Sequence, residues 1–268
     1  MIKRYWKQII VTGIIVAIVV ACATVPITGR KQVNLFPESQ MVEMGITNYS
    51  SFLKEAKLST NKEQADLVKK VGQKIANAVE TYLNENGMGS HIANFNWEFN
   101  LVDDDVPNAW CMPGGKVVFY TGILPYTRDE AGLAVVMGHE IAHAVARHGN
   151  ERMSHQMGMQ AGATALQIAI DEKPEETKQI YMAAFGLGAQ YGMMLPYSRS
   201  HETEADKMGL VFMAMAGYDP SAAVGFWTRM SQSGGQKPPE FMSTHPADDT
   251  RISDIKAYLP EAMKYYNK

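Results

Sequence analysis

The feature that most constrains the fold is the segment His139-Glu-Ile-Ala-His143. Two histidines four residues apart share one face of a helix, about one turn apart, so this segment must be helical for the imidazoles to act together. The segment Thr127–Glu130 has the form of a capping box and predicts that the helix begins near Arg128. Two imidazoles in this arrangement can bind one Zn²⁺, and Glu140 beside them can reach a water on the metal.

A catalytic zinc needs a third protein ligand and an open coordination position. The strongest candidate is Glu202, at the start of the segment Glu202-Thr-Glu-Ala-Asp206. Glu202 and Asp206 are four residues apart and share a helix face. One carboxylate can therefore bind the metal while the other accepts a hydrogen bond from a ligand imidazole. We predict one zinc ion per chain, and we expect Glu204 to face solvent.

The other histidines have less certain roles. His245 follows a Gly- and Pro-rich loop, 234–239, that could act as a lid. Three interpretations are open for it: a donor to the transition-state oxyanion, a fourth zinc ligand that blocks the water position until the loop moves, or a helix-start residue without a chemical role. We expect His148 to hydrogen-bond within the scaffold, next to the ligands. His155 and His201 are expected at the surface or beside the ligands.

Composition limits the class of protein. The chain has 268 residues, 46% hydrophobic and 20% charged, values typical of one globular domain and not of a disordered chain or a polytopic membrane protein. The net charge of -3 provides no basic surface, which excludes nucleic acid as a partner. Two cysteines allow at most one disulfide. We interpret Cys111 as a small apolar residue or a free thiol.

The N-terminal residues have the layout of a targeting signal. A start with three positive charges precedes the apolar run Ile9–Ala23. This run is shorter than the roughly 20 residues of a spanning helix. It ends in Val19-Val-Ala-Cys22, which resembles the bacterial lipobox with Cys22 as the lipidated residue; an uncleaved anchor with an incidental cysteine is the alternative. We predict a signal peptide at 1–21, a lipidated N-terminus and extended tether at 22–37, and a single domain at 38–268.

The pattern of apolar residues predicts an α+β fold that is mostly helical. Between residues 94 and 120 the pattern alternates, which favours a small antiparallel sheet with strands near 95–102 and 116–120. The remaining apolar residues recur at helical spacing. The expected helices cover about 37–58, 61–84, 128–149, 151–171, 176–194, 200–216, 220–232 and 249–258. Many of the 18 methionines fall in these helices, where they either fill the core or form an adaptable lining for apolar peptides.

Several motifs carry a family resemblance. Besides the two metal motifs, the chain contains Arg147-His-Gly149, Ser198-Arg199, Pro107–Gly115, and Thr244-His-Pro246 with Arg251-Ile252. Together these resemble metallopeptidase family forty-eight, a family of gluzincin zinc peptidases. The resemblance spans about residues 36–258 and, with the lipobox, favours the bacterial periplasmic lipoprotein branch.

The resemblance implies roles for individual residues. It implies that His139, His143 and Glu202 bind zinc and that Glu140 is the general base. Zinc lowers the pKa of a bound water from 15.7 to about 7, and Glu140 can take the proton and later return it to the leaving amine.

A substrate site is also implied by the resemblance. The strand 116–120 looks like the edge strand on which gluzincins align an extended peptide, and backbone pairing of this kind suits any substrate sequence. The alternative is an ordinary edge strand. The candidate substrate-binding residues before it are Asn108, Ala109, Gly114 and Gly115.

Two functional hypotheses follow. The first is a zinc endopeptidase that hydrolyses unfolded or misassembled envelope proteins, with outer-membrane assembly machinery as a partner. The second is a non-catalytic lipoprotein chaperone or assembly factor with a structural zinc. Glu140 favours the enzyme because a structural site has no use for a base. Ala23 in place of Asp favours the periplasmic face of the outer membrane over the inner membrane.

Overall fold

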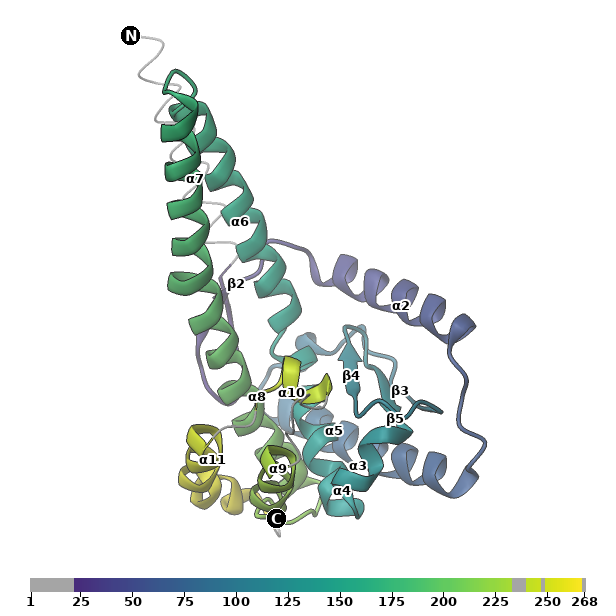
Figure 1. The fold of residues 1–268 in the computed structure, drawn as a ribbon. Coiled ribbons are helices and arrows are strands. Elements are labelled where there is room, and N and C mark those ends of the chain that lie inside the picture. Colours follow the sequence, from purple (N-terminus) through teal and green to yellow (C-terminus); the bar gives the residue numbers. More distant parts are fainter. Residues whose placement is uncertain (1–21, 233–239, 247–248, 267–268) are drawn as a thin grey trace.

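The computed structural model describes residues 22–232, 240–246 and 249–266 (Figure 1). The fold is α+β and mostly helical, as predicted. Its helices are α2 (Glu38–Glu55), α3 (Lys62–Glu85), α4 (Leu124–Thr127), α5 (Glu130–Val145), α6 (His148–Ala169), α7 (Glu175–Ala189), α8 (Leu195–Met215), α9 (Ala222–Gln232), α10 (Glu240–Thr244) and α11 (Asp249–Ala262). Its strands are β1 (Cys22–Thr24), β2 (Lys31–Val33), β3 (Glu98–Val102), β4 (Ala109–Met112) and β5 (Lys116–Tyr120).

Helices α5 and α8 pack closely at the centre of the body. Helix α5 is buried on nearly every face, because it is built almost entirely of apolar and small residues. Two glycines face each other where the helices cross. A Cβ on Gly138 would lie 2.8 Å from the carbonyl oxygen of Gly209, and one on Gly209 would lie 2.9 Å from the backbone nitrogen of His139. This backbone contact sets the distance between the two helical turns that carry the metal motifs.

Helix α5 has a different cap from the one predicted. Its N-cap is Asp129, whose side chain accepts a hydrogen bond from the backbone N–H of Gly132 at 2.8 Å. Thr127 instead ends α4, and Arg128 at φ 67° turns the chain between the two helices. The capping box was therefore a wrong prediction, although the helix itself is present. The helix also ends earlier than expected, because Arg147 adopts a left-handed φ of 60°.

The sheet is mixed and not antiparallel. Its strand order is β3-β5-β4, with β3 parallel to β5 and β4 antiparallel to it. Strand β5, predicted as the edge, lies in the centre, and β3 and β4 form the two edges. The unbroken apolar run Val117-Val-Phe119 explains this position, since a central strand that is covered on both faces must be apolar at consecutive positions.

Helices cover both faces of the sheet. On one face Tyr49 of α2 packs with Val102 and Val118. On the other face Val117 and Phe119 belong to the main core, together with residues of α3 and α5. The sheet is thus held between α2 and the central helices, and β4 runs beside α5.

The segment predicted as an extended tether is folded against the body. Strands β1 and β2 form an antiparallel hairpin. Val25 at its turn is fully buried in the main core, and Arg30 forms ion pairs with residues of α6 and α8. The prediction of an extended tether at 22–37 was therefore wrong. The segment folds against the body because Val25 enters the main core and Arg30 pairs with two buried carboxylates.

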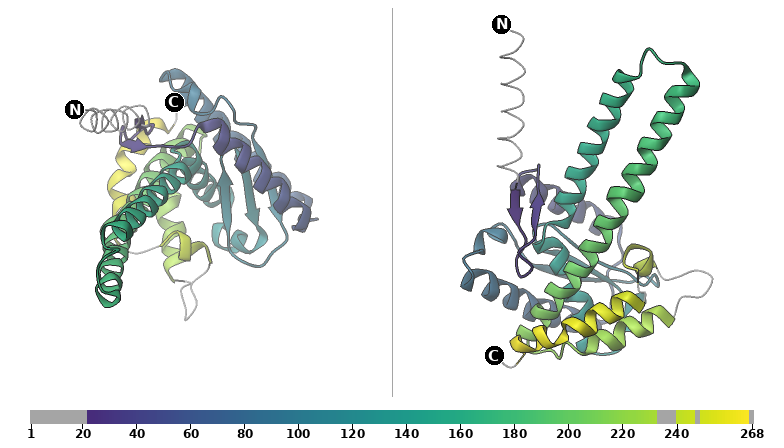
Figure 2. Two further views of the ribbon diagram at one scale, coloured as in Figure 1. Left: turned by 90° about the horizontal axis from the view of Figure 1, so that it is seen from above. Right: turned by 90° about the vertical axis from the view of Figure 1, so that its left-hand side faces the viewer.

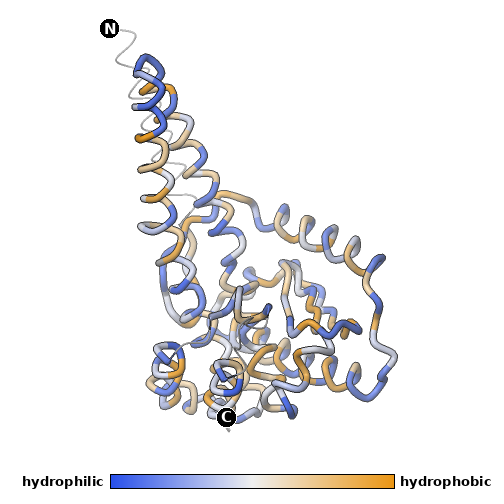
Figure 3. Tube along the Cα trace, viewed as in Figure 1, coloured by the Kyte–Doolittle hydropathy of each residue, from blue (hydrophilic) through white to orange (hydrophobic). Residues whose placement is uncertain are grey.

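Helices α6 and α7 form an antiparallel pair that projects from the body (Figures 1 and 2). Several apolar side chains on it are exposed, and orange positions run along it in Figure 3. Met208 and Met213 fill the core, one of the two roles predicted for the methionines. Met157 on α6 and Met193 in the turn after α7 are exposed. No helix in the described part of the chain combines the length and hydropathy needed to cross a bilayer.

Helices α7 and α8 are joined without the break expected near residues 195–199. A π-helical turn, Gln190–Met194, connects them. Pro196, near the start of α8, has no backbone N–H to donate to the preceding turn. This continuity carries the chain from the projecting pair directly into the helix with Glu202.

Candidate metal centre

Four side chains from three parts of the chain meet beside the α5–α8 crossing. His139 and His143 come from α5, Glu202 from α8 and His245 from the residues after α10, and one donor atom of each lies within 4.8 Å of all the others. The Nε2 atoms of His139 and His143 are 3.1 Å apart. The two Glu202 carboxylate oxygens lie 3.3 Å from these nitrogens, and His245 Nδ1 lies 2.8 Å from Glu202 Oε2. The predicted triad is thus brought together, and His245 joins it.

This donor set fits one zinc ion. Imidazole nitrogens and a carboxylate are typical zinc ligands, and four donors that converge on one point suit its tetrahedral coordination. The neighbouring Glu140 is buried, and its Oε1 has no hydrogen-bond partner among the described residues. Burial raises the pKa of Glu140. Glu140 therefore has a free acceptor oxygen beside the donor cluster, where it could take a proton from a water on the metal.

Asp206 orients His139 from behind. Its Oδ1 accepts a hydrogen bond from His139 Nδ1 at 2.9 Å, which leaves Nε2 directed at the donor cluster. Arg251 donates to the same carboxylate at 2.7 Å and lies over the ring of Trp227. Burial lowers the pKa of His139, but its bonds to Asp206 and Glu202 outweigh burial and raise the pKa to about 9. The geometry therefore agrees with the predicted place of Asp206.

His143 is oriented by a second chain of contacts. His148 Nδ1 lies 2.8 Å from His143 Nδ1, and His148 Nε2 lies 3.0 Å from Glu204 Oε2. Burial lowers the pKa of His148 to about 4, so its ring is neutral. The expectation that Glu204 faces solvent was wrong: it is 4% exposed and points inward to His148. His201 is buried too, with its Nε2 2.8 Å from Glu151.

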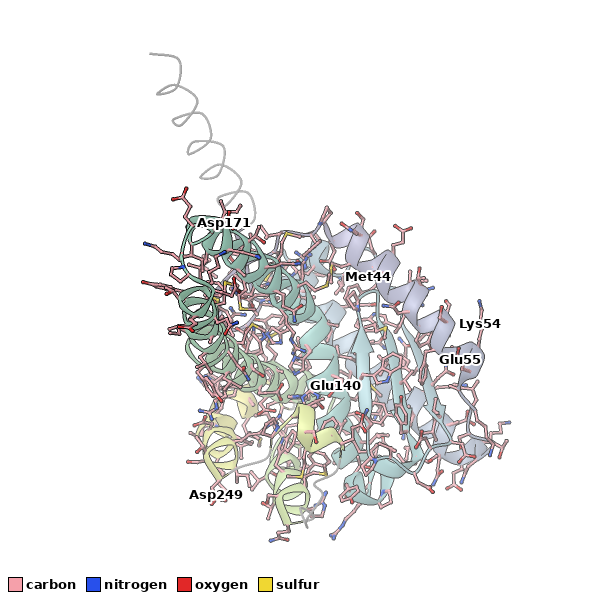
Figure 4. All side chains as sticks on the ribbon, turned by 45° about the horizontal axis from the view of Figure 1, so that its top comes forward. Met44, Lys54, Glu55, Glu140, Asp171 and Asp249 are labelled. Carbon is pink, nitrogen blue, oxygen red and sulfur yellow. The ribbon has the colours of Figure 1, made fainter. Side chains whose placement is uncertain are left out.

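A cleft of about 560 Å³ opens onto the donor cluster. Its walls include Glu140, His143 and His245 on one side, and Asn108 with β4 on the other. In Figure 4, Glu140 lies in the interior, between the sheet and the helices of the second half of the chain. The edge strand that borders the cleft is therefore β4. This role was predicted for the strand 116–120, which begins seven residues later.

The other predicted substrate residues divide between cleft and turn. Asn108 and Ala109 line the cleft. Gly114 and Gly115 form the β4–β5 turn at φ 90° and 78°, and a Cβ on Gly115 would lie 2.8 Å from the ring of Trp97. Cys111 also lines the cleft, and burial raises the pKa of its thiol well above the ordinary value, so it is not an activated nucleophile.

The site defines a class, and comparison with known proteins gives the family. Two histidines and a glutamate on one helix, with a downstream glutamate, define a metal centre of the H-E-x-x-H class. The model of Peptidase family M48 matches residues 69–259, more than half of the chain. The chain therefore belongs to this family, in agreement with the resemblance found in the sequence.

Individual relatives show how far the similarity extends. The chain is 39% identical to the mitochondrial metalloendopeptidase OMA1 of Schizosaccharomyces pombe over 176 residues, which are 65% of this chain and 50% of that protein. With the OMA1 of Homo sapiens it is 31% identical over 246 residues, 89% of this chain and 46% of that protein. With the beta-barrel assembly-enhancing protease of Yersinia pestis it is 32% identical over 172 residues, 60% of this chain and 34% of that protein. The chain spans half or less of each relative.

Proposed function

We propose that this chain is a zinc-dependent endopeptidase. The observation that carries the proposal is the placement of Glu140: its buried carboxylate lies next to four metal donors and borders a cleft edged by strand β4. A structural zinc site needs donors but no free base. The family and the relatives named as metalloendopeptidases support the same conclusion.

His139, His143 and Glu202 would hold the zinc, with Glu140 beside them. When bound, Zn²⁺ lowers the pKa of water toward 7 and polarises a peptide carbonyl. Glu140 accepts the proton of the attacking water and later donates it to the amine of the departing peptide. Its buried position raises its pKa and so improves it as a base. Asp206 keeps the Nδ1–H tautomer of His139, so that Nε2 retains its lone pair for the metal.

An extended peptide would bind along β4. Strand β5 pairs with one side of β4, and the cleft that contains Glu140 lies against residues 108–111. Backbone pairing at such an edge holds peptides of different sequence in one register. Asn108 and Ala109 are the candidate substrate contacts at the start of this edge.

His245 would be a fourth ligand in the resting protein. Its Nδ1 belongs to the donor cluster, and its Nε2 lies 3.5 Å from Glu140 Oε1. In this position it would occupy the place that water or substrate needs. Cleavage would require His245 to leave the cluster, after which its imidazole could donate a hydrogen bond to the developing oxyanion. The loop 234–239, expected as a lid, lies outside the described residues.

The test uses zinc removal and return. The purified chain is stripped with a chelator, reloaded with one equivalent of Zn²⁺, and incubated with denatured casein. We expect cleavage to disappear with the metal and return with it. Cleavage by the stripped protein would refute the zinc mechanism. Stoichiometric zinc binding without cleavage of any unfolded protein would instead support the chaperone hypothesis.

We further propose an envelope location and envelope substrates. The support is the lipobox-like sequence before Cys22 and the similarity to relatives named as beta-barrel assembly-enhancing proteases. The OMA1 relatives are named as mitochondrial, so location needs its own test. Cells labelled with palmitate should yield labelled, membrane-bound protein from the wild type and unlabelled protein from Cys22→Ala. Equal labelling and fractionation would refute the lipid anchor.

A further inference from the structure

Arg30 of the N-terminal hairpin connects two helices of the metal centre. Its guanidinium donates to both carboxylate oxygens of Glu151 on α6, at 2.8 and 2.7 Å. It also donates to Glu204 Oε2 on α8, from Nε at 2.9 Å and from a terminal nitrogen at 2.7 Å. Thr28 of the same hairpin donates to the other oxygen of Glu204. The hairpin therefore fixes the Glu204 carboxylate on both of its oxygens.

The fixed carboxylate has a specific partner on the side of the metal centre. A carboxylate oxygen can only accept, so the hydrogen between Glu204 Oε2 and His148 Nε2, which lie 3.0 Å apart, belongs to the imidazole. With that hydrogen on Nε2, His148 Nδ1 can accept the hydrogen of His143 Nδ1, which lies 2.8 Å away. His143 then keeps its own lone pair on Nε2, the atom that faces Glu202 and His139. The order of donors along this chain gives His143 the tautomer that a metal ligand needs.

Arg30 is suited to this task by burial and geometry. The side chains of Glu151 and Glu204 are 1% and 4% exposed, whereas Arg30 is 26% exposed. Two buried carboxylates this close to one another repel unless a cation separates them, and a planar guanidinium can bind both at once. Without Arg30, Glu204 would lose the partner that holds it against His148.

We propose that Arg30 is a positioning residue for the metal ligand His143, acting through Glu204 and His148. The hairpin that begins at Cys22 is thus part of the metal centre and not a spacer. The inference rests on the proposed zinc site but does not depend on peptidase activity. One histidine ligand of α5, His139, is oriented by Asp206 on α8. The other, His143, would be oriented by a residue more than one hundred positions earlier in the sequence.

The test measures zinc affinity of the full-length protein by competition with a chromophoric chelator, and the Co²⁺ absorption spectrum as a report on ligand geometry. Arg30→Met is compared with Lys31→Met, a matched control on the same hairpin whose exposed side chain donates to Thr24 of the hairpin itself. We expect Arg30→Met to weaken zinc binding about 10-fold, in the range typical of residues that orient metal ligands, and to alter the Co²⁺ bands. Lys31→Met should stay within about twofold of the wild type, a change too small to reflect a lost ligand support.

A double-mutant cycle separates positioning from general destabilisation. In the His148→Phe background the ring can neither donate nor accept, so the route from Arg30 to His143 is interrupted and Arg30→Met should change the zinc affinity less than about twofold. An equal loss in both backgrounds, or an unchanged affinity of Arg30→Met, would overturn the proposal. If Arg30→Met does not fold, Arg30→Lys takes its place, with a smaller loss of the same sign. Zinc affinity is measured without substrate, so absent peptidase activity would refute the proposed function and leave this inference standing.

Discussion

Replacing Asp206 by Asn would remove one charge from a buried cluster while preserving its shape. Asp206 accepts from Arg251 at 2.7 Å through both oxygens and from His139 at 2.9 Å, and it is 8% exposed. Removal of one partner from a buried ion pair costs about 3–5 kcal/mol, because the remaining charge stays buried. Because Asn keeps one acceptor oxygen, we expect the loss to lie at the lower end of this range, about 3 kcal/mol in the free energy of unfolding of the zinc-free protein.

The same substitution should weaken zinc binding. Asn cannot hold the Nδ1–H of His139 and the Arg251 guanidinium together, so His139 loses its fixed orientation. Loss of such a partner typically lowers metal affinity 10–100-fold, equivalent to about 1.4–2.7 kcal/mol. Urea unfolding followed by circular dichroism in a chelator gives the first quantity, and chelator competition gives the second. The matched control is Asp254→Asn, on the exposed side of α11. Equal zinc affinity in Asp206→Asn and the control would refute the reasoning.

Other outcomes follow from the helix crossing, from His245 and from the buried carboxylates. Gly209→Ala should cost about 1–3 kcal/mol of stability and weaken zinc binding, since its Cβ would meet the backbone of α5, whereas Gly186→Ala has open space; urea unfolding compares the two. His245→Ala should lower zinc affinity and change casein turnover; an unchanged value of both excludes a role at the metal. Burial raises the pKa values of Glu151 and Glu204, but bonds from Arg30 and neighbouring histidines lower both from 4.5 to about 2. Because both pKa values are lower in the folded state, their contribution to stability is complete above pH 4.5 and is lost as the pH falls toward 2. The loss reaches up to about 3 kcal/mol per carboxylate. Urea unfolding at a series of pH values measures it, and constant stability between pH 4.5 and pH 2 would contradict this prediction.

Local sequence spacing predicted the parts of the site that lie on single helices. The pair His139 and His143 and the pair Glu202 and Asp206 are each four residues apart, and a helix places such residues on one face whatever surrounds it. His245 was identified as a candidate, but its place among the donors depends on how α10 packs, which spacing does not encode. Family resemblance supplied the ligand roles.

Features set by distant packing were not predictable in this way. From sequence alone, Glu204 occupies a helix position that is typical of a solvent-exposed residue. It is buried because it binds Arg30, a residue 174 positions earlier, and local spacing gives no sign of that contact. The centre of the sheet was misassigned because alternation gives strand faces but not strand order, although the continuous apolar run at 117–119 was a usable signal. The cap of α5 was misassigned because both Thr127 and Asp129 are good N-caps, and the turn at Arg128 selects the second.

The central claim is that Glu140 performs proton transfer at a zinc centre that forms without it. The most direct test measures bound zinc and kcat/KM for casein-derived peptides in the same samples of wild type and Glu140→Gln. We expect one zinc per chain in both proteins and a loss of at least about 100-fold in kcat/KM for the variant, the usual effect of removing a general base. A zinc-loaded Glu140→Gln protein that cleaves peptide as fast as the wild type would contradict the account.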